Sequence, residues 1–160
     1  MTMNRRKPSN NNDQRDELEV LHAEHVELLE MFGKLSDADS RHHRAAEKKL
    51  AAEACKALRR HSQIEAELFY PALRASSVLD VDLVDAARIE HRTLDELVLE
   101  LSHTDPRSRE YAGKIDALAM YAAHHFREEE AKLFPRARAS GLDLAELARR
   151  IAHRKAELEG

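Results

Sequence analysis

Apolar residues recur at every third or fourth position along most of the chain, which is the spacing of one face of an α-helix. Leu18, Leu21, Leu28 and Phe32 show this spacing in the first periodic stretch. Polar breaks and prolines separate the stretches, because proline lacks a backbone N–H and interrupts the helical hydrogen-bond ladder. The pattern therefore predicts five helices, over residues 16–35, 41–70, 81–102, 107–134 and 144–158.

Prolines and a capping residue set several of these predicted boundaries. Pro71 is expected to end the second helix and Pro135 the fourth. Ser140 and Gly141 stop any continuation, and Asp143 is placed to cap the last helix. Four long helices joined by short breaks predict an all-α fold, an antiparallel up-down-up-down four-helix bundle with an additional short C-terminal helix.

The chain divides into three segments. Residues 1–15 are polar and rich in Asn, which predicts a disordered N-terminal lead. Residues 16–139 form the predicted bundle, and residues 140–160 a C-terminal helix packing on it. The whole sequence has only four Gly, four Pro and no Trp, and the helix formers Ala, Leu, Glu and Arg recur throughout, which favours helix over strand.

Charge and cysteine content exclude several classes of protein. The net charge of −4 and the lack of a long basic stripe argue against a nucleic-acid partner. No apolar run approaches the roughly 20 residues that span a bilayer, so no membrane partner is expected. Cys55 is the only cysteine, which excludes an intrachain disulfide and favours a cytoplasmic location. Ten histidines are many for 160 residues, and they need a physical explanation.

The second half of the chain repeats the first. Glu24-His25 recurs as Glu90-His91, each followed three residues after the histidine by a leucine. Each half then has a His-x-x-x-Glu pair that is followed by the motif Leu-Phe-(Tyr)-Pro. In both halves the proline comes ten residues after the histidine of the pair. Each half is thus predicted to be a helical hairpin, with one histidine on its first helix and a pair on its second. The pairs are His61 with Glu65 and His125 with Glu129.

The pair spacing alone is not diagnostic, because His-x-x-x-Glu occurs five times in this chain. Most occurrences are expected on solvated helix faces. Only two share the offset to Leu-Phe-(Tyr)-Pro and a preceding Glu-His dipeptide. The five begin at His43, His61, His124, His125 and His153.

The selected residues predict a metal site. Residues four apart lie on one helix face, so each His-Glu pair points in one direction. Burying imidazoles and carboxylates is unfavourable unless a partner, such as a metal cation, compensates them. Two matched hairpins suggest two metals with Glu65 and Glu129 as bridges, and nitrogen and oxygen donors suit iron, manganese or zinc. The predicted ligands are His25, His61, Glu65, His91, His125 and Glu129.

Three further residues lie one helical turn from a predicted ligand. His22 precedes His25, Asp95 follows His91, and Tyr121 precedes His125. Each could complete the coordination, and each could instead be an ordinary boundary or core residue. The spacing leaves both alternatives open.

The combination of these motifs resembles the hemerythrin-like (HHE cation-binding) family over about residues 16–158. The resemblance implies a four-helix bundle around a non-haem di-iron centre, bridged by carboxylates and an oxo or hydroxo group. Iron is therefore implied by the resemblance and not by the spacing. The residues that carry it are Glu24-His25, His61 to Glu65, Leu68-Phe69-Tyr70-Pro71, Glu90-His91, His125 to Glu129, and Leu133-Phe134-Pro135.

The sequence departs from the oxygen-carrying members of this family at two positions. Those members have a histidine four residues after the first on the third helix, where this chain has Asp95. Their last helix has a carboxylate five residues after its histidine, a position held here by Glu130, while Glu129 comes at four. A less saturated centre would leave open positions on both metals, which favours redox chemistry or sensing over oxygen carriage.

The leading functional expectation is a di-iron protein that binds a small diatomic or peroxide ligand (O2, NO or peroxide) for sensing, storage or carriage. The alternatives are a redox enzyme, peroxidase- or catalase-like or NO-reducing, and an iron store or donor that repairs iron sites. A metal-free interaction bundle is the remaining possibility. The sequence names no redox partner and is compatible with a monomer or a homodimer.

Overall fold

The computed structural model describes residues 18–37, 44–76 and 81–160. Every regular element in these ranges is helical, which confirms the predicted all-α class. The predicted disordered lead, residues 1–15, lies outside the described residues, as does His43. The elements are α1 (Glu19–Ser36), α2 (Arg44–Ile64), η2 (Glu65–Phe69), α3 (Tyr70–Arg74), α4 (Val81–Ser102), α5 (Arg109–Glu128), η3 (Glu129–Leu133), α6 (Phe134–Ala139) and α7 (Leu144–Glu159).

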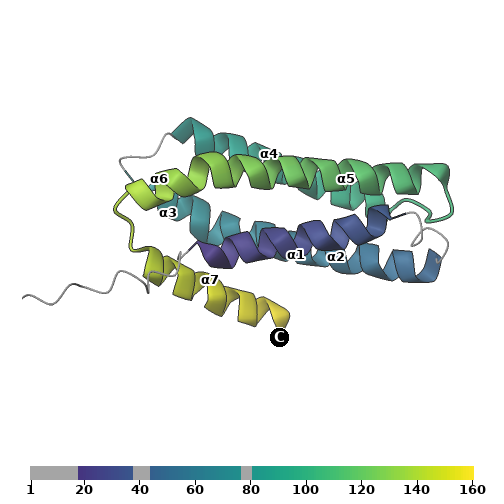
Figure 1. Ribbon diagram of the computed structural model, residues 1–160, viewed down its shortest axis with the longest axis horizontal. Helices are drawn as coiled ribbons and strands as arrows, with labels where there is room; N and C mark the ends of the chain where they lie inside the picture. The colour runs from purple at the N-terminus through teal and green to yellow at the C-terminus, as the bar shows by residue number, and fades with distance from the viewer. Residues whose placement is uncertain (1–17, 38–43, 77–80) are drawn as a thin grey trace, which may run out of the picture.

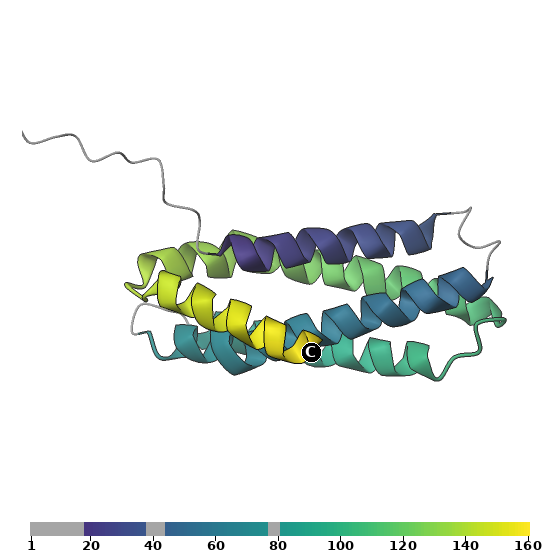
Figure 2. The ribbon, with the colours of Figure 1, turned by 90° about the horizontal axis from the view of Figure 1, so that it is seen from below.

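The long helices α1, α2, α4 and α5 run alongside one another with alternating direction (Figure 1). Helix α1 packs against α2 and α5, and α4 packs against α5 and α2. Helix α7 lies on the outside of this bundle, against α1, α2 and η2, as the view from below also shows (Figure 2). The predicted four-helix bundle with an additional C-terminal helix is therefore confirmed.

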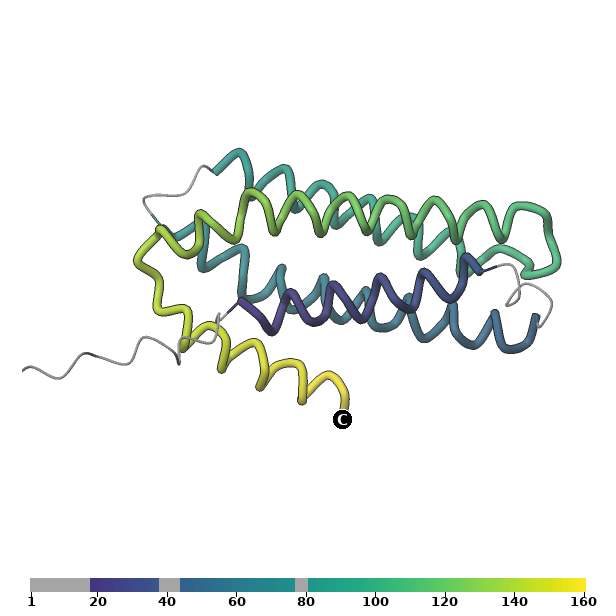
Figure 3. The backbone as a smooth tube through the Cα atoms, viewed as in Figure 1, coloured from purple at the N-terminus to yellow at the C-terminus, as the bar shows by residue number. Residues whose placement is uncertain are grey.

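The two prolines do not end their helices, and this part of the prediction was wrong. The chain continues helically through η2 into α3, and through η3 into α6 (Figure 3). Each η segment is a π-helical turn, in which the N–H of Tyr70 donates to the carbonyl of Glu65 and that of Phe134 to Glu129. Each proline then falls in the first turn of the next helical segment, where a missing N–H is tolerated.

The interior consists of two apolar clusters with a polar layer between them. Helices α1, α2 and α4 each pass from one cluster to the other at a histidine, as α1 does at His25 between Leu21 and Leu28. The first cluster, near α3, α6 and α7, includes Leu18, Leu21, Ile64, Phe69, Leu73, Val84, Ala87, Leu133, Phe134, Leu147 and Ile151. The second includes Leu28, Phe32, Leu35, Leu58, Leu94, Val98, Ile115, Leu118 and Phe126.

Helix α7 begins after a sharp turn and is held by both apolar and charged contacts. Gly141 has a φ of 76°, a left-handed conformation that glycine adopts without strain. The carboxylate of Asp143 accepts the N–H of Glu146 at 2.9 Å, so the predicted cap is confirmed. Arg154 pairs with Glu67 at 2.7 Å, which ties the helix to η2. In the described part of the chain, no helix is long and apolar enough to cross a bilayer.

Candidate metal centre

Six buried polar side chains converge in the layer between the two apolar clusters. None is more than 6 % exposed. They come from all four long helices and from the two π turns, so the folded bundle is needed to assemble them. They are the six residues that the sequence repeat selects: His25, His61, Glu65, His91, His125 and Glu129.

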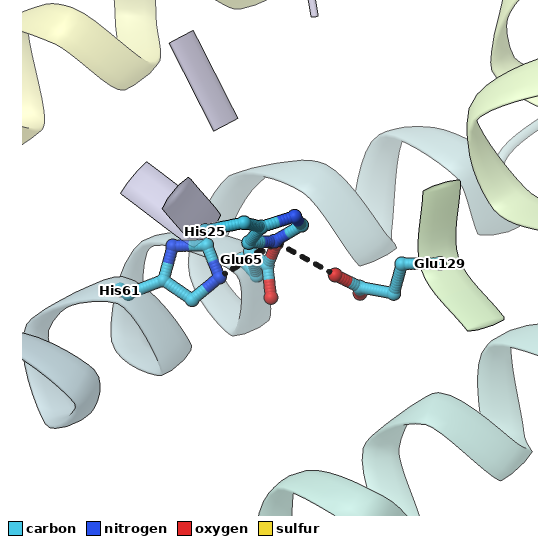
Figure 4. Close-up of side chains that lie close together, drawn as sticks. All are labelled: His25, His61, Glu65 and Glu129. Atoms are coloured by element: carbon cyan, nitrogen blue, oxygen red, sulfur yellow. Dashed lines mark hydrogen bonds and ion pairs between the residues drawn. The ribbon is translucent and has the colours of Figure 1, made fainter. Parts of the chain in front are cut away.

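The first of two groups contains His25, His61, Glu65 and Glu129, whose donor atoms all lie within 4.8 Å of one another (Figure 4). The Nε2 atoms of His25 and His61 are 3.2 Å apart. Nε2 of His61 lies 3.2 Å from Oε1 of Glu65, and Nε2 of His25 lies 3.4 Å from Oε2 of Glu129. Imidazole nitrogens and carboxylate oxygens offer lone pairs, and their convergence at such short range indicates a position that suits a cation.

The second group contains His91, His125 and the same two glutamates, again with donor atoms within 4.8 Å of one another. Nε2 of His91 lies 2.9 Å from Oε2 of Glu65. Nε2 of His125 lies 3.6 Å from Oε1 of Glu129. Each histidine pair thus comes from one hairpin, and the two groups follow the two halves of the sequence repeat.

The two glutamates are shared in a defined way, because each directs one oxygen to each group. Glu65 points Oε1 toward His61 and Oε2 toward His91. Glu129 points Oε2 toward His25 and Oε1 toward His125. A carboxylate with its two oxygens in two neighbouring donor sets is placed to bridge two cations.

The π turns begin at these two glutamates. Glu65 is the first residue of η2, and Glu129 the first residue of η3. In both halves the proline follows six residues after the glutamate, directly after the residue that makes the wide π hydrogen bond. Insertions of this kind occur often at functional sites, where they re-aim side chains within a helix.

The fit of the site to a cation can be judged from its buried polar atoms that have no hydrogen-bond partner. Oε1 of Glu65, Oε2 of Glu129 and Nε2 of His125 have no hydrogen-bond partner among the described residues, although all three are buried. An unsatisfied buried polar atom costs about 1–3 kcal/mol, and more when it is charged. All three atoms point into the two donor groups, so metal cations would satisfy them together.

A second layer of carboxylates orients the imidazoles. Nδ1 of His61 donates to Glu24 at 2.9 Å, and Nδ1 of His125 donates to Glu90 at 2.6 Å. Glu24 and Glu90 are the residues of the two Glu-His dipeptides, each reaching across to the second helix of its own hairpin. This arrangement leaves Nε2 facing the centre and is usual for metal-binding histidines.

When no metal is present, protons on the imidazoles of the first group compensate the negative charge of its carboxylates. Burial lowers the pKa of His25, but hydrogen bonds and charges from Glu129 and Glu65 outweigh it and raise the pKa to about 10. Burial likewise opposes charge on His61, and Glu65 with Glu24 raises its pKa to about 9. For Glu65, burial raises the pKa, but the imidazoles, first that of His61, hold it well below its usual value. Cations would replace these protons.

The structure shows where the three residues lie whose part in the coordination the spacing left open. His22 lies outside the centre, with its half-exposed ring 2.8 Å from the carboxylate of Glu130. Asp95 is exposed at the surface beside His91. Tyr121 packs against the second apolar cluster. Glu130 accepts a hydrogen bond from Nδ1 of His25 at 2.8 Å, so it orients a ligand candidate from the second layer.

Tyr70 is a member of the centre that sequence reasoning missed. Its hydroxyl donates to Glu129 and lies 2.9 Å from Nε2 of His91. Burial raises the pKa of Tyr70 well above its usual value, and the charges of Glu129 and Glu65 raise it further, so the phenol keeps its proton. The signal was a mismatch within the repeat, because the position matching Tyr70 in the second half is Phe134.

Comparison with known proteins supports a cation-binding role. The profile of the hemerythrin HHE cation-binding domain matches residues 16–137. Among solved structures, a hemerythrin HHE cation-binding domain-containing protein from Mycobacterium kansasii is similar, with a TM-score of 0.72 and 28 % identity over 89 % of this chain and 86 % of that one. No curated protein matches the chain. The resemblance found in the sequence is thus confirmed, and the chain belongs to the hemerythrin HHE cation-binding domain family.

Proposed function

We propose that this protein holds a non-haem di-iron centre that binds a small ligand such as O2, NO or a peroxide. His25 and His61 would hold one iron, and His91 and His125 the other. Glu65 and Glu129 would bridge the two irons. When bound, the irons would supply open coordination positions and electrons for chemistry with the ligand.

One observation carries this proposal: each of two buried carboxylates is shared between two histidine pairs, with oxygens that have no hydrogen-bond partner. Exposed acidic clusters form without a metal, but this one is nearly inaccessible to water, so solvent cannot compensate it. The donors are nitrogen and oxygen without thiolate, a set compatible with iron, and the family adds weight to that choice.

The number of donors favours a reactive centre over a purely structural one. Each group offers four residues, two histidines and two shared glutamates. An octahedral ion would have positions left over for a small exogenous ligand. The chain would therefore contribute a buried, oriented and incompletely saturated site, which suits sensing, storage or carriage of such a ligand.

Iron analysis with optical spectroscopy of aerobically purified protein tests this proposal. We expect two irons per chain and a near-ultraviolet charge-transfer band in the parent protein. His61→Ala should lose the band and at least half of the iron. The matched control is His153→Ala, because His153 also begins a His-x-x-x-Glu pair but is 78 % exposed on α7. Loss of iron from both variants, or from neither, would contradict the proposed ligand set.

A second candidate function, redox turnover of peroxide or NO, is favoured by Tyr70. A protonated phenol that touches both a bridging carboxylate and a histidine can supply a proton or a hydrogen bond at the centre. Binding a ligand without turnover does not require a proton donor.

Tyr70→Phe separates the two functions, and Phe134 shows that phenylalanine is accommodated at the matching position of the repeat. We expect the variant to keep its iron and its fold. If the protein is an enzyme, turnover of hydrogen peroxide should fall by about 10²-fold or more, the range of a lost proton donor. Negligible peroxide and NO turnover by the parent would leave the binding function and exclude the enzyme.

A further inference from the structure

The two sides of the centre differ at three matched positions of the repeat. These positions lie one, five and nine residues after the histidine of each His-x-x-x-Glu pair. The spacing of four places them on one face of the helix. The first half has Ser62, Ala66 and Tyr70, whereas the second half has Phe126, Glu130 and Phe134.

The second-half residues close the side of the centre that contains His25. The ring of Phe126 stacks on His25 at a centroid distance of 4.2 Å, and Phe134 stacks on it at 5.9 Å. Glu130 accepts the Nδ1 hydrogen bond of the same imidazole at 2.8 Å. His25 is 1 % exposed as a result, so two aromatic rings and a carboxylate cover this side of the centre.

The first-half residues leave the side of His91 open. Ser62, Ala66 and Tyr70 line a cleft of about 1030 Å³ together with His91, between α2 with η2 on one wall and α4 on the other. His91 is the most exposed of the six side chains, at 6 %. Where the second half has two aromatic rings and a carboxylate, the first half has one ring and two small side chains.

The inner end of this cleft contains an unpartnered hydroxyl. Oγ of Ser62 is buried and has no hydrogen-bond partner in the described part of the chain, and the side chain lines the cleft. Tyr70 also lines the cleft, and its hydroxyl lies 2.9 Å from Nε2 of His91. The hydroxyl of Ser62 can donate to a ligand that carries lone pairs, whereas the single proton of Tyr70 is already donated to Glu129.

We infer that a small ligand with lone-pair oxygen or nitrogen atoms enters through the α2–α4 cleft and binds on the side of the centre formed by His91 and His125. Ser62 is the hydrogen-bonding group that receives it, and Tyr70 lines the route beside His91. This inference rests on the proposed function and adds to it the route, the receiving side and the residue that receives the ligand.

The test narrows the open side of the centre with an added aromatic ring. Ala66→Phe places a ring over the cleft at a position whose native side chain is exposed, so folding should be preserved. Its matched control is Ala52→Phe, on an exposed face of α2 away from the cleft. Ser62→Ala removes the unpartnered hydroxyl without narrowing the route. Sodium azide is the probe, added to the iron-loaded, air-oxidised protein, with iron content measured for every variant.

We expect Ala66→Phe to slow azide association by about tenfold or more, while the Ala52→Phe variant keeps the parent rate. Ser62→Ala should leave the association rate unchanged and increase azide dissociation several-fold. Full iron content with an unchanged association rate in Ala66→Phe overturns the entry route, and an unchanged dissociation rate in Ser62→Ala overturns the role of that hydroxyl. A parent protein without iron would instead overturn the proposed function and this inference with it.

Discussion

At the scale of single residues, the centre depends on how two carboxylates divide their oxygens. Glu65 and Glu129 each face both histidine pairs, so neither could be assigned to one hairpin alone. Burial raises the pKa of Glu65, but the imidazoles, first that of His61, hold it well below its usual value when no metal is present, so its charge is compensated by imidazolium protons. Metal binding must displace those protons, so loading the centre at neutral pH should release acid.

The same imidazoles make the stability of the metal-free protein dependent on pH. The pKa values of His25 and His61 are raised to about 10 and about 9 in the folded protein. They are about 6.5 in the unfolded chain. Their stabilisation is therefore fully present below pH of about 6.5 and is lost as pH rises toward 9–10. The slope is at most about 1.4 kcal/mol per pH unit for each proton.

We accordingly expect the free energy of unfolding of chelator-treated protein, measured with urea, to fall steadily between about pH 7 and pH 10. The iron-loaded protein is the control, because the metal replaces these protons and should flatten the profile. Stability of the metal-free protein that is constant or rising over this range would contradict the proposed protonation of the first group.

At the scale of elements, the π turns and the C-terminal helix position the centre. The turns η2 and η3 begin at the bridging glutamates, and each is followed by a proline that would be unfavourable in an uninterrupted α-helix. Helix α7 contributes Lys155, whose ammonium lies 3.1 Å from Oε1 of Glu24. Since the other oxygen of Glu24 accepts from His61, a residue beyond the matched family range reaches the second layer of the site.

Lys155→Met should therefore weaken the centre without removing any proposed ligand. It leaves the buried carboxylate of Glu24 without its cation, which disturbs the orientation of His61. Loss of such second-layer partners typically lowers metal affinity by 10–100-fold, and we expect about tenfold here, measured by competition with a chelator. Arg149→Met, at an exposed position of α7, is the control and should match the parent. Equal affinities in all three proteins would show that α7 has only a packing role.

At the scale of the whole molecule, much of the architecture follows from the sequence, and its exceptions have a common cause. The helix over 81–102 matches its prediction, and the Asp143 cap forms as expected, because both depend on local signals. The prolines were misjudged because each follows a π turn, which lets the helix continue and which no local sequence signal predicts. Tyr70 was overlooked because its partners come from other helices.

The sequence repeat selects the six proposed ligands, and the structure brings them together in space. The repeat alone does not show what the side chains at its mismatched positions do in the fold. Phe126 and Ser62 occupy matching positions, yet one covers an imidazole and the other lines a cleft. The mismatch is visible in the sequence, but only the packing of neighbouring helices shows that it covers one side of the centre and leaves the other open.

The central claim is that two irons lie between two histidine pairs and share two carboxylates. Anomalous diffraction from crystals of the iron-loaded protein, recorded on both sides of the iron absorption edge, tests it most directly. The account predicts two iron peaks, one beside His25 and His61 and the other beside His91 and His125, with Glu65 and Glu129 bound to both. A single peak, no peak, or iron located away from these residues would contradict it.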